Sequence, residues 1–259
     1  MHSTLQIKNF GLNNLLGPYL AGFHSISTNK TRNLSLVVWG RNLPSTVGCG
    51  KFTKVIRLMI VLPPFQDSVV VGMLLSDAWL VFSSSKSKNA RLGLAQSYSH
   101  KEYVLLSFSI LSHYCNSLPV YRERIRKGKE QCSLEFTTRS LPCFTELYHM
   151  FYPDKTKIIP NNIYDLLTPV ALAHVIMGDG SFHPVNGGLL ICTDSYSIKE
   201  VVNLMNVLII RYNLTCSIRQ HNKGQYRVSI HKQSIKSLAA LVKPYMDPSF
   251  YYKIGEVDK

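Results

Sequence analysis

Two aspartates occupy equivalent places in an internal repeat, and their carboxylates are the groups best suited to chemistry. Asp77 ends an apolar segment that begins at Val71, and Asp179 ends the matching segment that begins at Ala173, at an offset of 102 residues. Each segment is expected to be a helix, whose C-terminus carries a partial negative charge that disfavours a carboxylate. One such aspartate would be no more than a solvated residue at a helix end. The same unfavourable choice in both copies marks a functional site.

Small side chains in the two predicted helices would let these carboxylates meet. Val69–Gly72 and Ala171–Ala173 permit close helix contact, and a divalent cation would neutralise two neighbouring carboxylates. Metal ions that flank a phosphate stabilise the attacking and leaving oxygens of hydrolysis. The alternative is that the small residues only fill a core, with no metal nearby. Oxygen ligands suit Mg²⁺ or another divalent cation, and the candidate ligands are Asp77, Asp179 and the backbone carbonyls of Ala78 and Gly178.

Two further pairs follow the same repeat. Lys157 and Lys253 are equivalent at an offset of 96 residues, and a lysine beside a phosphodiester stabilises developing negative charge or helps to activate water. Gln96 and Asp194 are equivalent at an offset of 98 residues and follow a predicted strand, where they could orient a metal ligand or a water molecule. The alternatives are a solvated surface lysine and an ordinary turn residue before a helix.

The repeat predicts two fused copies of one small α+β domain, related by a pseudo-twofold axis. Residues 96–104 and 194–202 are identical at six of nine positions. A repeat of about 100 residues is too long for a solenoid unit. Each copy is predicted to have the order αββαββα with antiparallel sheets, and Ser99 and Ser197 are expected to cap its second helix. The predicted elements are helix 68–75, strands 79–83 and 91–97, helix 101–115, strands 121–126 and 132–138 and helix 140–150 in the first copy, and helix 169–177, strands 181–184 and 188–193, helix 198–212, strands 215–220 and 225–231 and helix 234–242 in the second.

The charge of the chain favours a polyanionic partner. The 259 residues include 29 Lys and Arg but 15 Asp and Glu, a net charge of +14. Nucleic acid fits this charge best, and an anionic membrane surface fits it less often. No apolar run is long enough to span a membrane, and the six cysteines lack the spacing of zinc ligands.

The first 66 residues differ from the rest because they contain seven basic and no acidic residues. Such a stretch is typical of a mitochondrial transit peptide, a translated lead-in from an upstream coding segment, or an arm that contacts phosphates. We expect residues 1–40 to be weakly structured and order to begin near Val55. The predicted organisation is an N-terminal extension at 1–64, a first subdomain at 65–160 and a second subdomain at 161–259.

Residues 65–255 resemble a single-chain LAGLIDADG homing endonuclease. The two motifs stand as Val70-Val-Gly-Met-Leu-Leu-Ser-Asp77-Ala78 and Leu172-Ala-His-Val-Ile-Met-Gly-Asp179-Gly180. The flanking segments 157–162 and 241–245 resemble the subgroup typified by the yeast mitochondrial omega-intron endonuclease. Ser76 and Gly178 replace the earlier Asp of the motif, a position that varies in the family. His174 stands where a small residue is common, so we expect either looser packing or a side chain directed to a polar rim.

The resemblance implies two sheets that form a saddle over double-stranded DNA, with strand residues in the major groove. It also implies that Asp77 and Asp179 bind Mg²⁺, that Lys157 and Lys253 assist beside them, and that the fused copies act as a monomer. The predicted DNA contacts are polar and basic residues of the strands and their turns: Lys86, Lys88, Arg91, Arg122, Arg124, Arg126, Arg139, Arg219, His221, Arg227 and His231.

The sequence therefore predicts an intron-encoded, site-specific double-strand DNA endonuclease of a mitochondrion. An RNA maturase that assists splicing of its host group I intron is the first alternative, because the family includes such proteins on the same fold. A non-catalytic DNA-binding protein is the second alternative, although both motif aspartates are present. Binding to a membrane surface would explain the charge but not the repeat, so we expect no membrane partner.

Overall fold

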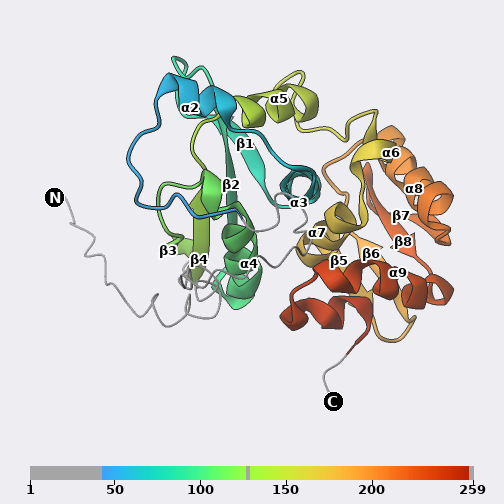
Figure 1. The fold of residues 1–259 in the computed structure, drawn as a ribbon. Coiled ribbons are helices and arrows are strands. Elements are labelled where there is room, and N and C mark those ends of the chain that lie inside the picture. Colours follow the sequence, from blue (N-terminus) through green and yellow to red (C-terminus); the bar gives the residue numbers. More distant parts are fainter. Residues whose placement is uncertain (1–42, 127–128, 257–259) are drawn as a thin grey trace, which may run out of the picture. The chain divides into compact units, whose positions relative to one another are not determined.

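The structure, a computed structural model, describes residues 43–126 and 129–256 and consists of two copies of one topology after a short N-terminal segment (Figure 1). The N-terminal segment contains helix α2 (Lys54–Met59). The first copy contains α3 (Pro64–Leu75), β1 (Trp79–Phe82), β2 (Ala90–Ser97), α4 (Lys101–Leu111), β3 (Val120–Arg126), β4 (Lys129–Thr137) and α5 (Pro142–Phe151). After α6 (Ile163–Leu166), the second copy contains α7 (Pro169–Asp179), β5 (Gly180–His183), β6 (Gly188–Ile191), α8 (Ile198–Tyr212), β7 (Cys216–Asn222), β8 (Gln225–Ile230) and α9 (Ile235–Val242).

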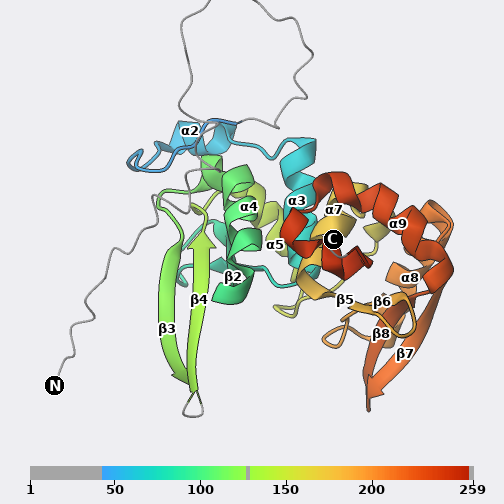
Figure 2. The same cartoon turned by 90° about the horizontal axis from the view of Figure 1, so that it is seen from below.

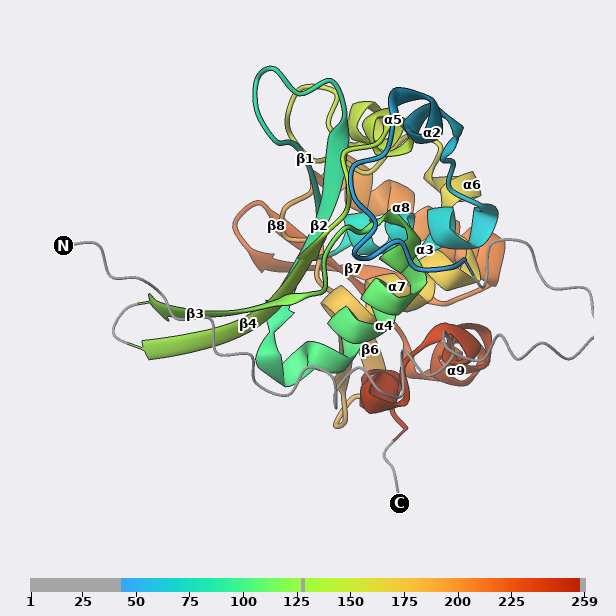
Figure 3. The ribbon, with the colours of Figure 1, turned by 60° about the vertical axis from the view of Figure 1, so that its left-hand side comes forward.

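The predicted αββαββα order is confirmed in both copies. Each copy forms one antiparallel four-stranded sheet, with strand orders β1-β2-β4-β3 and β5-β6-β8-β7. Alternation along the strands separates two faces: on β2 the buried Leu92 and Leu94 face the helices, and the more exposed Arg91 lies on the other face. We call this second side the open face of each sheet. In the first sheet the β3–β4 hairpin continues beyond the end of β2 (Figure 3).

Helices α3 and α7 lie side by side and are buried almost throughout (Figures 1 and 2). Their segments 69–75 and 170–177 are apolar on all sides apart from His174, which is typical of a helix in the centre of a protein. Their close contact depends on Gly72: a Cβ atom at this position would lie 2.2 Å from the carbonyl oxygen of Ala171 and 2.8 Å from Cβ of His174. The predicted close contact of small residues is therefore present where the two helices cross.

His174 is accommodated in the core between the copies. Its side chain is buried, and burial lowers its pKa to about 3, so the imidazole is neutral. Its Nδ1 lies 3.4 Å from the hydroxyl of Tyr103 on α4, and that hydroxyl also donates to the carbonyl of His174 at 3.3 Å. The expectation of a side chain at a polar rim was wrong, because His174 is buried at the interface, where Gly72 lets α3 come close to its Cβ.

The N-terminal segment 43–62 is packed on the first copy. The Thr46 hydroxyl donates to the carbonyls of His113 and Cys115 at 2.8 and 3.0 Å, and the Tyr114 hydroxyl donates to the carbonyl of Val61 at 3.1 Å. We expected order to begin near Val55, but the described residues begin at 43, and residues 44–50 already hydrogen-bond to the first copy. The expectation for residues 1–40 lies outside the described residues.

The two predicted caps had different outcomes. Ser197 caps α8, and Glu200 completes a capping box with it. Ser99 does not cap α4, because a 3₁₀ turn over Tyr98–His100 precedes that helix and His100 takes the cap position.

Within residues 43–126 and 129–256, no helix is long and apolar enough to cross a membrane.

Replacing Gly72 with alanine tests the contact between α3 and α7. We expect Gly72→Ala to lower the free energy of unfolding by about 2 kcal/mol or more, because the new Cβ collides with backbone of Ala171. The loss would outweigh the helix propensity that alanine gains, about 1 kcal/mol. The measurement is urea unfolding of the full chain. Gly50→Ala is the control, since a Cβ there has nothing within 4 Å; equal stability of both variants would contradict the close contact.

Candidate functional site

Asp77 lies in a turn directly after α3. The helix ends at Leu75, and the amides of Ser76 and Ala78 both donate to the carbonyl of Met73, at 3.2 and 2.9 Å. The Ser76 hydroxyl donates to the carbonyl of Gly72 at 3.1 Å. These bonds tighten the last turn of α3, so that Asp77 follows the helix in a fixed position.

Asp179 is the last residue of α7, and its carbonyl accepts from the amide of Cys192 at 3.0 Å. The two helix ends meet at Gly178. A Cβ at this position would lie 2.9 Å from Oδ2 of Asp77 and 2.6 Å from Oγ of Ser76. A larger residue at 178 would therefore push against the Asp77 carboxylate. The structure brings the two predicted aspartates into one site.

The electrostatics of the site reflect this proximity. Burial raises the pKa of Asp179, and the charge of Asp77 adds to this rise against the opposing effects of Lys157 and Lys253, so that the pKa is about 7. A carboxylate that is buried beside another carboxylate favours its neutral form until a cation compensates the charge. Ionisation of Asp179 is therefore disfavoured even though two lysines lie nearby.

Lys157 and Lys253 each hold the helix end of their own copy. The Nζ of Lys157 donates to the carbonyls of Ser76 and Ala78 at 2.8 and 2.9 Å, and that of Lys253 donates to the carbonyls of Met177 and Gly178 at 2.6 and 2.8 Å. Burial lowers the pKa of Lys157 to about 8, and burial also lowers the pKa of Lys253. The two aspartates oppose both shifts, so each lysine lies within electrostatic reach of both carboxylates.

The donor set fits a hard divalent cation. Two carboxylates and several backbone carbonyls point to Mg²⁺ chemistry, because Mg²⁺ is usually held by one or two carboxylates together with water and substrate phosphate. Within the described part of the chain, no group of three or more His, Cys, Asp or Glu side chains forms a metal cage of its own. The carbonyls of Ala78 and Gly178, predicted as ligands, each accept a lysine hydrogen bond and keep a second lone pair.

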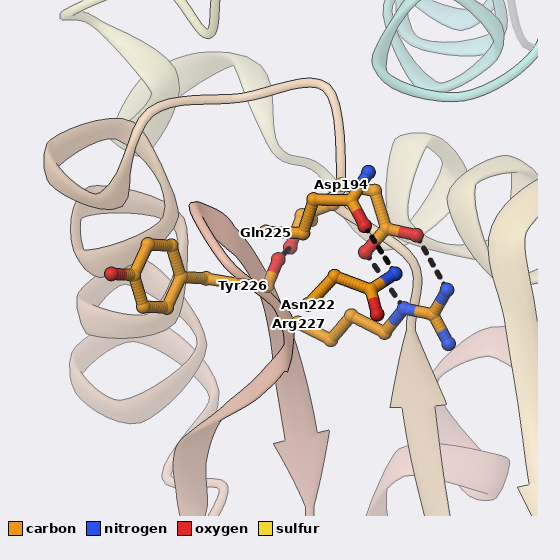
Figure 4. Close-up of polar contacts among 6 residues, drawn as sticks. Asp194, Asn222, Gln225, Tyr226 and Arg227 are labelled. Carbon is orange, nitrogen blue, oxygen red and sulfur yellow. Dashed lines mark hydrogen bonds and ion pairs between the residues drawn. The ribbon is translucent and has the colours of Figure 1, made fainter.

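Gln96 and Asp194 occupy equivalent positions but make different contacts. The Gln96 amide donates to Oδ2 of Asp77 at 2.5 Å, so it fixes one oxygen of that carboxylate. Asp194 instead forms a two-point ion pair with Arg227, whose Nε donates to Oδ1 at 2.8 Å (Figure 4). The hydrogen bonds from Arg227 lower the pKa of Asp194. Of the pair, only Gln96 touches a motif aspartate directly.

Most of the predicted nucleic-acid contacts lie on the open faces or on nearby turns. Arg122 and Arg124 are exposed on β3 and both pair with Glu135, and Arg219 is exposed on β7 opposite Arg227. Lys86, Lys88 and His221 are also exposed. Arg91 is half-buried, and its Nε has no hydrogen-bond partner among the described residues. The imidazole of His231 lies 2.9 Å from the Ser217 hydroxyl. The side chain of Arg126 lies outside the described residues.

Arg139 is placed differently from the other predicted contacts. Its guanidinium donates to the carbonyls of Thr46, Cys49 and Gly50 at 3.0, 2.5 and 2.9 Å, and it lies 4.1 Å from the ring centroid of Phe52. These contacts attach the N-terminal segment to the end of the first sheet. Both terminal nitrogens of its guanidinium, Nη1 and Nη2, donate to the protein itself, which indicates an anchoring role, whereas its Nε has no hydrogen-bond partner among the described residues.

Sequence reasoning did not assign a role to two buried tyrosines beside the site. Tyr103 bonds to His174 from the first copy, and the Tyr196 hydroxyl donates to the carbonyl of Leu75 at 3.1 Å from the second. The repeat contained a signal, since Ser-Tyr-Ser recurs at residues 97–99 and 195–197. This repeat pairs Tyr196 with Tyr98, does not include Tyr103, and did not indicate that Tyr196 rather than Tyr98 would be buried.

Asp179→Asn tests the electrostatics in metal-free buffer. An aspartate has an unfolded pKa near 3.9, and the raised folded value of about 7 means that the folded state keeps a proton between these two pH values. The contribution of this proton to the free energy of unfolding is fully present below the unfolded pKa, and it is lost as the pH rises through the folded pKa of about 7. We therefore expect Asp179→Asn to be more stable than wild type at pH 8 by about 2 to 4 kcal/mol.

The measurement is urea unfolding with EDTA at pH 8 and at pH 5. The difference between variant and wild type should shrink at pH 5, where the folded wild type keeps this side chain neutral, and should vanish only near the unfolded pKa of about 3.9. A variant that is less stable at pH 8, or a difference that does not change with pH, would contradict the raised pKa.

Arg139→Leu tests the anchor of the N-terminal segment. Loss of its contacts should release residues 43–52, so that trypsin cuts after Lys51 and Lys54 at least about tenfold faster than in wild type. Mass spectrometry of a limited digest gives the rates. Arg219→Leu, which removes an exposed arginine from the open face of the second sheet, should leave them unchanged; equal rates in all three proteins would refute the anchoring role.

Comparison with known proteins gives the family. The model of the LAGLIDADG DNA endonuclease family matches residues 67–238. The chain is similar to the cytochrome b mRNA maturase bI2 of Debaryomyces hansenii, with 32% identity over 217 residues and 80% of each chain covered. It is also similar to the intron-encoded endonuclease ai4 of Dictyostelium discoideum, with 37% identity over 123 residues, 47% of this chain and 76% of that protein.

A solved structure has the same fold over most of the chain. The homing endonuclease I-WcaI bound to its DNA recognition sequence superposes with a TM-score of 0.73 and 25% identity, covering 84% of this chain and 98% of that one. The motif helices, the paired aspartates at their ends and these similarities agree with one another. The chain belongs to the LAGLIDADG DNA endonuclease family.

Proposed function

We propose that this protein is an intron-encoded, site-specific endonuclease that hydrolyses both strands of a DNA target with a divalent cation, Mg²⁺ in the first instance. The observation that carries the proposal is the meeting of Asp77 and Asp179 at Gly178, with a lysine at each helix end, half-buried Lys157 and buried Lys253. Membership in the family and the likeness to I-WcaI support the same reaction class.

The side chains at the site have distinct roles in this reaction. A cation bound by the two carboxylates would stabilise negative charge that develops on the phosphodiester. Lys157 and Lys253 add positive charge beside the same phosphate. Since burial lowers the pKa of Lys157 to about 8, this amine can exchange a proton with water near neutral pH. Gln96 holds one oxygen of Asp77 and thereby orients the other.

The open faces of the two sheets are the proposed DNA surface. Arg122, Arg124 and Arg219 are exposed there, and the net charge of +14 suits phosphate contact. Phosphate contacts would give salt-dependent affinity, and strand side chains in the major groove would read base edges. Because two copies supply two half-sites in one chain, we propose that a monomer binds the target.

We also propose a mitochondrial location, in line with the similarity to a cytochrome b mRNA maturase. The proposed subdomain limits stay at residues 65–160 and 161–259.

A maturase activity is the second candidate function, because the similarity to maturase bI2 covers 80% of each chain. In this case the partner is the host group I intron RNA, and the chain would assist splicing with or without DNA cleavage. Asp77 and Asp179 would then be dispensable for splicing. This separates the two functions experimentally.

The decisive experiment uses the full chain and a duplex that joins the exons flanking its host intron. We expect Mg²⁺-dependent cleavage of both strands, and a loss of at least about a hundredfold in Asp77→Asn and Asp179→Asn. DNA affinity without metal should be retained in both variants. Asp165→Asn, at an exposed acid on α6, is the matched control and should cleave as wild type does.

Binding of the duplex without cleavage would overturn the endonuclease proposal. Stimulated splicing of the intron RNA by the same preparation would then assign the maturase function. Cleavage that survives in Asp77→Asn and Asp179→Asn would refute the assigned site even in an active enzyme.

A further inference from the structure

Two tyrosines at equivalent repeat positions have different environments. Tyr196 is 5% exposed, and its hydroxyl donates to the carbonyl of Leu75 at 3.1 Å. The ring of its counterpart Tyr98 packs edge-on against Tyr121 at 5.2 Å between centroids, and the Nζ of Lys101 lies 5.1 Å from it. Only the second copy therefore sends this tyrosine hydroxyl to the centre of the molecule.

The bond from Tyr196 reaches the last residue of α3, two residues before Asp77. Carbonyls in the last turn of a helix lack partners within the helix and need partners from elsewhere. Here Gly72 accepts from the Ser76 hydroxyl, Met73 accepts from backbone amides, and Leu75 accepts from Tyr196. The bond to Leu75 thus comes from the other copy of the repeat.

Tyr196 is itself held firmly on the second copy. Its amide donates to the carbonyl of Thr193 at 3.1 Å, and the Thr193 hydroxyl donates to the carbonyl of Tyr226 on β8 at 2.5 Å. The next residue, Ser197, begins the capping box of α8 with Glu200. The tyrosine therefore projects from a junction that is fixed on both sides.

A second anchor reaches the same turn and is joined to the first. The Glu200 carboxylate that completes the capping box also accepts the amide of Ile159 at 2.8 Å. Two residues earlier, Lys157 binds the carbonyls of Ser76 and Ala78. The turn that carries Asp77 is thus held directly by Tyr196 and Lys157, and indirectly by Glu200, which binds the segment next to Lys157.

The end of α7 is likewise held by a lysine of its own copy, but among the described residues its last turn accepts no tyrosine hydroxyl from the other copy. Lys253 binds Met177 and Gly178, and the amide of Cys192 binds the carbonyl of Asp179, so these contacts come from the second copy itself. Asp179 is therefore positioned by its own copy. The turn that carries Asp77 is held by Lys157 of its own copy and, in addition, by Tyr196 of the other copy.

We propose that Tyr196 is a positioning residue that fixes Asp77 against Asp179 across the pseudo-twofold axis. The expected effect on DNA cleavage rests on the proposed endonuclease function, whereas the expected effect on the position of Asp77 does not. The hydroxyl acts through Leu75 on the turn and touches no reacting group. Loss of this bond should loosen residues 76–78 and weaken cation binding, without changing the DNA surface.

The test compares Tyr196→Phe with Tyr98→Phe in the full chain, each of which removes one hydroxyl. In metal-free buffer, Tyr196→Phe should raise amide hydrogen exchange of Ser76 and Ala78 about tenfold, with Gly180 and Cys192 unchanged. Mn²⁺ affinity, measured by electron paramagnetic resonance, should fall about tenfold. Cleavage should need about tenfold more Mg²⁺ at half-maximal rate, with unchanged DNA affinity. Tyr98→Phe should match wild type in all four measurements.

The outcomes separate this inference from the proposed function. Unchanged exchange at Ser76 and Ala78, or equal loosening at both helix ends, would overturn the positioning role. A normal Mg²⁺ requirement and Mn²⁺ affinity in Tyr196→Phe would also overturn it. If the wild type binds Mn²⁺ but cuts no DNA, the endonuclease proposal fails, while the exchange and Mn²⁺ measurements still decide the role of Tyr196.

Discussion

The close contact of α3 with α7 is the constraint on which the rest of the structure depends. It requires the absence of a side chain at Gly72, where a Cβ would lie 2.2 Å from backbone of Ala171. The same approach brings the helix ends together at Gly178, so one packing interaction both joins the two copies and assembles the carboxylate pair. Stability and the proposed chemistry therefore rest on the same interface.

The two halves of the site are related by the repeat but are not equivalent in their support. Gln96 contacts Asp77, but its counterpart Asp194 is neutralised by Arg227. Tyr196 crosses to the first copy, but Tyr98 stays with its own. A fused chain can tolerate such differences because each half needs to work only once, whereas a homodimer would have to use one sequence for both. The asymmetry lies in the residues around the aspartates rather than in the aspartates themselves.

The basic residues of the chain serve at least two purposes. Arg122, Arg124 and Arg219 are exposed on the open faces, where phosphate contact is possible. Arg139 is occupied by carbonyls of the N-terminal segment, and Lys157 and Lys253 are occupied by carbonyls at the helix ends. A positive net charge therefore overstates the number of cations available to a polyanion, since backbone carbonyls engage several of them.

The sequence by itself determined the topology, the two motif helices, and the pairing of Asp77 with Asp179 and of Lys157 with Lys253. It could do so because a repeat shows the same residue type in the same local setting twice. The cap at Ser197 was predicted correctly, but Ser99, which is also followed by Lys-Glu two residues later, does not cap α4, so the local sequence did not decide this feature by itself. Only the tertiary structure decided that His174 is buried, that Arg139 is an anchor and that Tyr196 reaches α3. These contacts join residues that are far apart in the chain. They depend on how closely the two copies pack, because this packing decides which side chain fills the space beside Gly72 or Leu75.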